Sequence, residues 1–115
     1  MTRNFQLLAA GALVLAAVCM LTWASPASAQ QGKTLFTQKG CPTCHGPNGD
    51  KPLAPGYPHL KGQDATYIEN QIKAFKSQDS KTWRRGGNTA LMIPMAMTLS
   101  DAEAVEIAKW LASLH

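Results

Sequence analysis

The pentapeptide Cys41-Pro42-Thr43-Cys44-His45 carries the clearest chemistry in this chain of 115 residues. Each sulfur of a Cys-x-x-Cys pair can form a thioether with a haem vinyl group, and the imidazole of a directly following histidine can then reach the iron from one face. The motif therefore predicts one covalently attached haem c per chain. Cys41 and Cys44 would be the attachment points, and His45 would be an axial iron ligand.

Two other kinds of site could use the same cysteines. A thioredoxin-like dithiol shares the Cys-x-x-Cys spacing but needs a βαβ context, and no strand is legible in this sequence. A structural zinc would need two more ligands, and the remaining histidines, His59 and His115, lie at no zinc-finger spacing. Haem attachment is the interpretation that uses every side chain of the motif.

The second axial ligand separates an electron carrier from a peroxidase or a ligand-sensing haem protein. The stretch from Leu91 to Met97 offers three thioethers, those of Met92, Met95 and Met97, at a point where the chain could return over the other haem face. A thioether stabilises ferrous iron and raises the potential, which suits a carrier, whereas a vacant site suits ligand binding. One or two of these methionines are expected to fill gaps in the core.

The first 29 residues have the pattern of a cleaved secretory signal peptide. Arg3 supplies a positive charge, residues 5–24 are almost entirely apolar, and Ala27-Ser28-Ala29 is a small-x-small cleavage site. We therefore expect residues 1–29 to be removed and residues 30–115 to form a monohaem domain in the periplasm, without stable membrane insertion. An uncleaved anchor is the alternative, because the apolar run approaches the roughly 20 residues that span a bilayer.

The cysteines and the charge of the chain argue against a disulfide-stabilised domain and against a nucleic-acid-binding protein. Cys19 lies in the apolar run and is expected to be lost with it, so the domain would hold no structural disulfide. The chain has a net charge of +4, but its basic residues are too scattered for nucleic-acid binding. We hypothesise that Lys39, Lys51 and Lys61 surround an exposed haem edge and attract acidic redox partners.

Three helices are predicted, and they would have to position the motif. The first covers residues 33–39 and ends at Gly40. The second runs to about residue 77 after an N-cap at Asp64, and the third begins with the capping box Ser100-Asp101-Ala102-Glu103. Their expected buried residues are Leu35, Phe36, Ile68, Ile72, Phe75, Ile107, Trp110, Leu111 and Leu114. Residues 46–62 and 77–90 are predicted loops, so the fold class is all-α, with about three main helices packed around one covalent haem.

Four separate parts of the chain resemble class I cytochrome c, and more narrowly the small bacterial cytochromes of the c553 and c4 type. The matching residues are Gly32 and Phe36; Pro58, Leu60 and Gly62; Gln63, Tyr67, Gln71 and Phe75; and Met92, Ala96, Leu99, Ser100 and Asp101. With one haem motif, the chain corresponds to a single domain and not to the two-haem cytochrome c4.

The resemblance also assigns roles to individual residues. It implies that the Pro58 carbonyl accepts a hydrogen bond from His45, that Leu60 packs on the haem, and that Met92 is the second axial ligand, with Met95 as the runner-up. It implies close packing of Gly32 and Phe36 on the last helix through Ile107 and Trp110. A looser match suggests that Trp83 and Arg85, or the neighbouring Arg84, contact the haem propionates.

The function implied by the resemblance is electron transfer and not enzymatic catalysis. A periplasmic carrier would shuttle single electrons between a redox donor and acceptor, such as a dehydrogenase, an oxidase or a reductase. The alternative is a cytochrome subunit in permanent complex with an exported dehydrogenase that oxidises, for example, sulfur compounds or alcohols.

Overall fold

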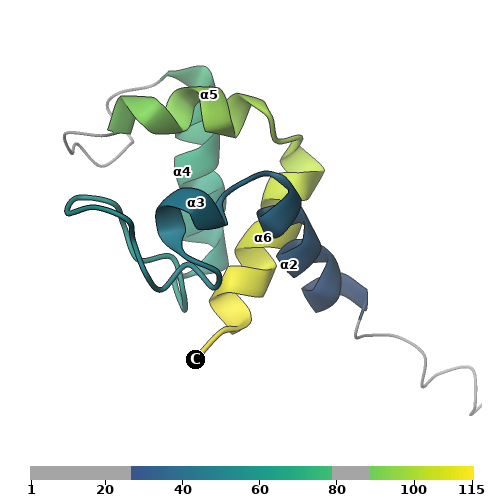
Figure 1. Cartoon of the computed structure of the whole chain (residues 1–115). Helices are drawn as coiled ribbons and strands as arrows, with labels where there is room; N and C mark the ends of the chain where they lie inside the picture. The colour runs from purple at the N-terminus through teal and green to yellow at the C-terminus, as the bar shows by residue number, and fades with distance from the viewer. Residues whose placement is uncertain (1–26, 79–88) are drawn as a thin grey trace, which may run out of the picture.

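The computed structural model describes residues 27–78 and 89–115, and within these two ranges every regular element is a helix. In chain order they are α2 (Ala27–Gln38), α3 (Pro42–His45), α4 (Ala65–Ser77), the 3₁₀ turn η1 (Thr89–Leu91), α5 (Met92–Met97) and α6 (Asp101–Ser113) (Figure 1). The predicted all-α class is therefore confirmed. Residues 46–62 contain no helix, as the glycines and prolines there predicted.

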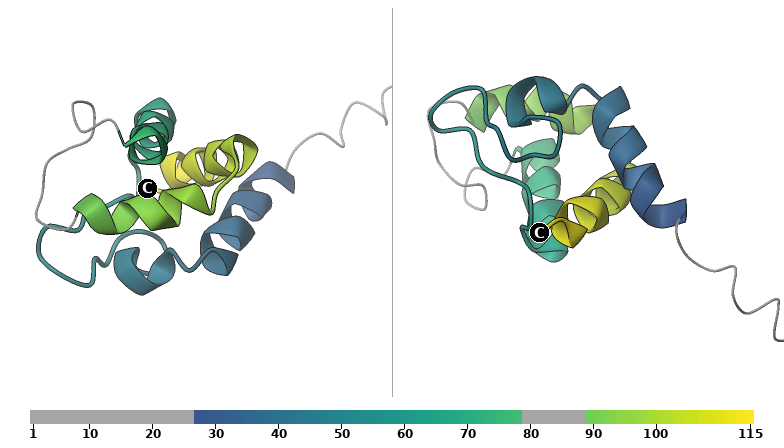
Figure 2. Two further views of the ribbon diagram at one scale, coloured as in Figure 1. Left: turned by 90° about the horizontal axis from the view of Figure 1, so that it is seen from above. Right: turned by 60° about the horizontal axis from the view of Figure 1, so that its bottom comes forward.

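Helix α2 packs across α6, as both views of Figure 2 show. Gly32 is buried at the crossing, where an added Cβ would lie 2.3 Å from the Glu106 carbonyl oxygen and 2.5 Å from Trp110 Cβ. One turn further along α2, the rings of Phe36 and Trp110 lie with their centroids 5.1 Å apart. The predicted contact between the first and last helices is confirmed, and only a residue without a side chain fits at position 32.

The predicted boundaries of α4 and the predicted start of α6 are correct, whereas the predicted start of α2 is wrong. Asp64 caps α4 by accepting from the Tyr67 N–H at 2.8 Å, and Ser100 and Glu103 form the capping box of α6. Helix α2, however, begins at Ala27 and not at Lys33. Gly32 lies inside this helix, and its close packing against α6 offsets its low helix propensity.

The protein core lies where α2, α4 and α6 meet, and α5 contributes at one end. Its buried side chains are Phe36, Ile68, Ile72, Ala96, Leu99, Ala104, Ile107, Ala108, Trp110 and Leu111. Leu35, Phe75 and Leu114, also expected inside, are half-buried and pack against this group. The apolar stripes read from the sequence therefore meet as expected.

Helix α5 was not predicted. Its sequence of six residues, Met92–Met97, is short and contains Pro94, so it lacks a clear periodic pattern. Pro94 is tolerated because it lies in the first turn, where its missing N–H has no partner to lose. Ala96 is fully buried and α5 packs on α4, so tertiary contacts stabilise a helix that would be too short to persist alone.

None of the helices within the described ranges is long and apolar enough to cross a membrane. The apolar run at residues 5–24 and Cys19 lie outside the described residues. Helix α2 includes the tripeptide Ala27-Ser28-Ala29, so the predicted cleavage after Ala29 would make the mature chain start inside α2. That cleavage stays a prediction.

The capping box of α6 gives a pH-dependence prediction. The Ser100 N–H and the Lys39 ammonium favour the charged form of Glu103 and lower the pKa of its carboxyl. A carboxyl whose pKa is lower in the folded state than in the unfolded state stabilises the fold at pH values above its ordinary pKa of 4.5. This stabilisation is lost as the pH falls through the pKa of the folded state. We expect Glu103→Gln, which still caps but carries no charge, to lose less stability than wild type between about pH 5 and pH 3.

Denaturant unfolding of the haem-loaded protein at several pH values would measure this difference. Glu69→Gln, which alters a carboxylate of α4 outside the capping box, controls for the change in net charge. Parallel pH profiles for wild type and Glu103→Gln would refute the assignment of this acid sensitivity to Glu103.

Candidate functional site

The motif residues form one helical turn. Pro42 occupies the first position of α3, and the turn closes through hydrogen bonds from His45 N–H to the Cys41 carbonyl at 3.1 Å and from Gly46 N–H to the Pro42 carbonyl at 2.9 Å. Residues three and four apart lie on the same side of a helix. The side chains of Cys41, Cys44 and His45 therefore start from one face of α3.

His45 is the one buried polar side chain among the described residues, with 5% of its surface exposed. Its Nδ1 lies 3.2 Å from the carbonyl oxygen of Pro58. A carbonyl can only accept, so this hydrogen bond requires the proton on Nδ1, and in the neutral imidazole Nε2 is then unprotonated. Burial lowers the pKa of His45, and the Pro58 contact offsets only part of this effect. Burial therefore favours the neutral imidazole, in which Nε2 is free to bind a metal, and this is the form that ligates iron.

The cysteines do not have the properties of a dithiol redox site. Burial raises the pKa of the Cys41 thiol to about 11. Reactive Cys-x-x-Cys pairs depend instead on a lowered pKa and a thiolate. Neither Cys41 nor Cys44 forms a disulfide, and both are half-buried. This chemistry suits attachment of a group through the sulfurs better than thiol-disulfide exchange.

Backbone hydrogen bonds hold the 46–62 loop against α3 and α6. The Leu53 N–H donates to the Cys44 carbonyl at 2.9 Å, the Leu60 N–H donates to the Gly49 carbonyl at 2.8 Å, and the Gly62 N–H donates to the Leu111 carbonyl at 2.9 Å. These bonds fold the loop so that Pro58 lies next to His45. The half-buried Leu60 packs against the core in the same region.

Sequence reasoning missed Tyr57 at this site. Its ring centroid lies 6.4 Å from that of His45, so an aromatic side chain borders the imidazole. The available signal was its position directly before Pro58. His59, by contrast, is exposed and takes no part in the site.

The three candidate methionines lie on α5, which neighbours α3 in both views of Figure 2. Met92, at the start of α5, is the least exposed of them, whereas Met95 is 38% exposed and Met97 is 59% exposed. Met92 and Ala96 are four residues apart and share a face of the helix, and Ala96 is fully buried. Trp83, Arg84 and Arg85 lie outside the described residues, so their predicted propionate contacts stay a prediction.

The surroundings of the motif fit a large apolar group. Leu53 of the loop, Leu91 of η1, and Met95 and Met97 of α5 are among the most exposed large apolar side chains of the described ranges. Leu53 lies in the loop after α3 and is bonded to Cys44, and the other three lie on η1 and α5, which also carry the candidate methionine ligands. A haem macrocycle would bring an apolar body to this region, and its attachment needs the two thiols and the imidazole that α3 supplies. Within the described ranges, no three His, Cys, Asp or Glu side chains gather to hold a bare metal ion.

The surface lysines near the site differ from one another. Lys39 donates to the Thr98 carbonyl oxygen at 3.0 Å and forms an ion pair with Glu103 at 3.0 Å. Its charge is therefore largely compensated within the protein. Lys51 and Lys61 are exposed. Of the three lysines expected to attract acidic partners, these two are the better candidates.

Comparison with known proteins identifies the family. The sequence profile described as Cytochrome c matches residues 29–115. The chain belongs to the cytochrome c family. The predicted class I cytochrome fold and its cofactor, covalently attached haem c, are therefore confirmed for this cytochrome, and Cys41 and Cys44 have the required spacing.

Individual relatives connect this cytochrome to bacterial electron-transfer proteins. It is 49% identical over 73 residues to cytochrome c-554(548) of Halomonas halodenitrificans, covering 64% of this chain and 82% of the relative. It is 32% identical over 99 residues to cytochrome c4 of Pseudomonas aeruginosa, covering 80% of this chain and 48% of the relative.

A third relative is named for its redox partner. The thiosulfate dehydrogenase electron acceptor of Thiomonas intermedia is 38% identical over 94 residues, covering 76% of this chain and 41% of the relative. This cytochrome thus spans less than half the length of this relative and of cytochrome c4. Its relationship to these proteins supports electron transfer as its function.

Proposed function

We propose that this cytochrome is a periplasmic electron carrier with a single haem, ligated by His45 and Met92. The observation that carries the proposal is the neutral, buried His45, held by Pro58, on a helix that neighbours the methionine-bearing α5. Haem iron with one imidazole and one thioether ligand exchanges single electrons and favours the ferrous state. Residues 1–29 would be the signal peptide that directs export, and residues 30–115 the domain that functions.

The residues around the haem would have different roles in electron transfer. Cys41 and Cys44 hold the cofactor covalently, while the hydrogen bond to Pro58 fixes the imidazole orientation of His45 and raises its basicity as a ligand. Leu60 and the exposed apolar side chains of the loop and α5 would exclude water from the cofactor. A rigid, dry site needs little rearrangement when the charge changes.

One experiment tests the carrier assignment directly. In a redox titration of the purified haem-loaded protein, we expect one reversible one-electron transition per chain. We also expect the ferric protein to show the thioether-to-iron charge-transfer band and to bind cyanide slowly. Rapid cyanide binding typical of five-coordinate haem, with no thioether band, would contradict the carrier assignment and favour a ligand-binding or peroxidase function.

A second candidate function is a cytochrome subunit of an exported dehydrogenase. It is favoured by two relatives named thiosulfate dehydrogenase electron acceptor, from Thiomonas intermedia and Stutzerimonas stutzeri. The partners of a free carrier and of a subunit are both redox proteins, so association distinguishes them. Gel filtration of a native periplasmic fraction should give a monomeric haem peak for a carrier, and co-elution with a larger dehydrogenase for a subunit.

A further inference from the structure

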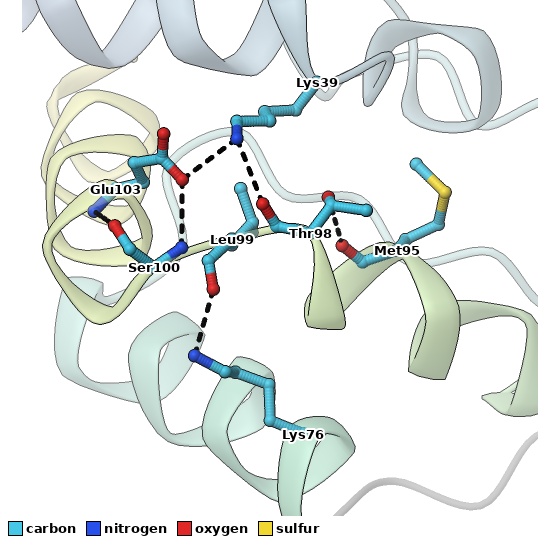
Figure 3. Close-up of polar contacts among 7 residues, drawn as sticks. All are labelled: Lys39, Lys76, Met95, Thr98, Leu99, Ser100 and Glu103. Atoms are coloured by element: carbon cyan, nitrogen blue, oxygen red, sulfur yellow. Dashed lines mark hydrogen bonds and ion pairs between the residues drawn. The ribbon is translucent and has the colours of Figure 1, made fainter.

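The connection between α5 and α6, residues 98–100, accepts hydrogen bonds from two lysine ammonium groups that belong to other parts of the chain (Figure 3). Lys39 follows α2 and donates to the Thr98 carbonyl oxygen at 3.0 Å. Lys76 lies in the last turn of α4 and donates to the Leu99 carbonyl oxygen, also at 3.0 Å. Two successive carbonyls of one short connection are thus bound by two cations, one just after α2 and one in α4.

Each lysine also binds a carboxylate at the start of α6. Lys39 pairs with Glu103 at 3.0 Å, through the same Oε2 atom that accepts from the Ser100 N–H at 2.9 Å. Lys76 pairs with Asp101 at 2.8 Å. Each ammonium group therefore bridges a backbone carbonyl just after α5 and an acidic side chain in the first turn of α6.

Helix-end electrostatics explain why this arrangement is favourable. The last carbonyls of a helix lack partners within it, and cations near that end are stabilising. Thr98 is the C-cap of α5, so the Lys39 ammonium meets the negative end of one helix and an acidic residue in the first turn of the next. Further hydrogen bonds join the connection to α5: the Thr98 hydroxyl donates to the Met95 carbonyl at 2.7 Å, and the Leu99 N–H donates to the Ala96 carbonyl at 3.1 Å.

The consequence concerns the methionine ligand. All three candidate methionines are on α5, a helix of six residues that depends on tertiary contacts for its position. Lys39 lies two residues before Cys41, so it ties the haem-attachment segment to the end of α5. Lys76 ties the same end to α4. These contacts fix where α5 lies relative to the His45 side of the site.

We infer that Lys39 and Lys76 are positioning residues that keep the thioether ligand on the iron by fixing the 98–100 connection. The inference rests on the proposed His45 and methionine ligation and holds for whichever methionine of α5 is the ligand. Both lysines would act through the connection that follows α5, because the hydrogen bonds and ion pairs of their ammonium groups are made to residues 98–103.

The test uses haem-loaded Lys39→Gln, Lys76→Gln and the double variant, because glutamine removes the charge and shortens the side chain without adding a new strong ligand. Cyanide can bind the ferric iron only after the methionine leaves, so its binding rate reports how often the ligand detaches. We expect the double variant to bind cyanide about tenfold faster than wild type, because two charge-assisted contacts donated by each lysine are lost. Each single variant should show part of this increase.

Lys109→Gln is the matched control. Lys109 forms an ion pair with Glu106 at 3.5 Å within α6 and makes no contact with the 98–100 connection. Its cyanide rate should stay within about twofold of wild type, the range expected for loss of an exposed pair. If the cyanide-binding rate rose equally in Lys109→Gln, Lys39→Gln and Lys76→Gln, a specific role for Lys39 and Lys76 would be refuted. A wild-type rate in the double variant would refute it as well.

Further measurements distinguish a failure of the positioning role from a loss of global stability or a failure of the proposed ligation. Denaturant unfolding of each variant measures global stability, and a cyanide rate that rises only in proportion to lost global stability would overturn the positioning role. If the double variant does not retain haem, the single variants provide the comparison. If wild-type protein itself shows no thioether band, the proposed ligation fails and the inference with it, whereas a normal wild-type band with unchanged variant rates overturns the inference alone.

Discussion

Replacement of Met92 with alanine is expected to abolish the thioether-to-iron charge-transfer band of the ferric protein. Loss of the thioether should also lower the reduction potential by roughly a few tenths of a volt, because axial ligands set haem potentials over a range of about 0.8 V. The ferric variant should bind cyanide at the rate of an open haem. Optical spectra and a redox titration of the purified variant measure these effects.

The structure supports the choice of Met92 over its neighbours. Met92 is the least exposed of the three methionines on α5, and it shares a helix face with the fully buried Ala96. Met97 lies on the opposite side of the helix and is 59% exposed. A side chain that is already partly enclosed loses less freedom on binding a metal than one that extends into solvent.

Met95→Ala and Met97→Ala are the matched controls, since each removes one thioether from the same short helix. Both should keep the band and a potential close to that of wild type. Survival of the band in Met92→Ala, together with its loss in Met95→Ala, would transfer the ligand role to Met95. Survival in all three single variants would show that one methionine can replace another.

Replacement of Gly32 with alanine is expected to destabilise the protein, although Gly32 lies inside a helix. In an ordinary helix interior this change stabilises by about 0.5–1 kcal/mol, because glycine loses more conformational freedom on folding. Here the new Cβ would lie 2.3 Å from the Glu106 carbonyl oxygen and 2.5 Å from Trp110 Cβ. We expect the free energy of unfolding to fall by about 1–3 kcal/mol, the usual cost of overpacking a core.

The reversed sign makes this prediction easy to check by denaturant unfolding of the haem-loaded protein. Lys33→Ala changes the adjacent, exposed residue of α2 and should alter stability by no more than about 0.5 kcal/mol, as surface substitutions usually do. Gly32→Val should be more harmful than Gly32→Ala, because it adds volume at the same contact. A more stable Gly32→Ala protein would show that α2 and α6 can separate at little cost.

The parts of the site that depend on neighbouring residues could be predicted from the sequence. The spacing of Cys41, Cys44 and His45 follows from the chemistry of attachment, and α3 presents them on one helical face. The Asp64 cap and the Ser100–Glu103 capping box are also local patterns, and both occur in the structure. In each case the interacting groups lie within four residues of one another, so their geometry hardly depends on the rest of the fold.

Two contacts between distant residues, that of Phe36 with Trp110 and that of His45 with Pro58, were expected from the family resemblance and occur in the structure. Other features that depend on distant partners were not predicted, or were predicted with the wrong extent. Helix α5 is too short to be stable alone and is stabilised by packing on α4, and the packing of Gly32 on α6 favours the early start of α2. Lys39 was expected to be a free surface charge, but it pairs with Glu103 and the Thr98 carbonyl. Nothing in the residues around Lys39 indicates these partners.

The sequence by itself therefore determined the cofactor chemistry of this cytochrome: covalent haem at Cys41 and Cys44, and a histidine placed to ligate its iron. Only the tertiary structure decided how the segment bearing the methionines is held, through Lys39, Lys76 and the connection after α5. The physical reason is the range of the interactions. Thioether attachment and helix capping involve groups close together in the chain, whereas the position of α5 results from contacts between segments 23 to 59 residues apart.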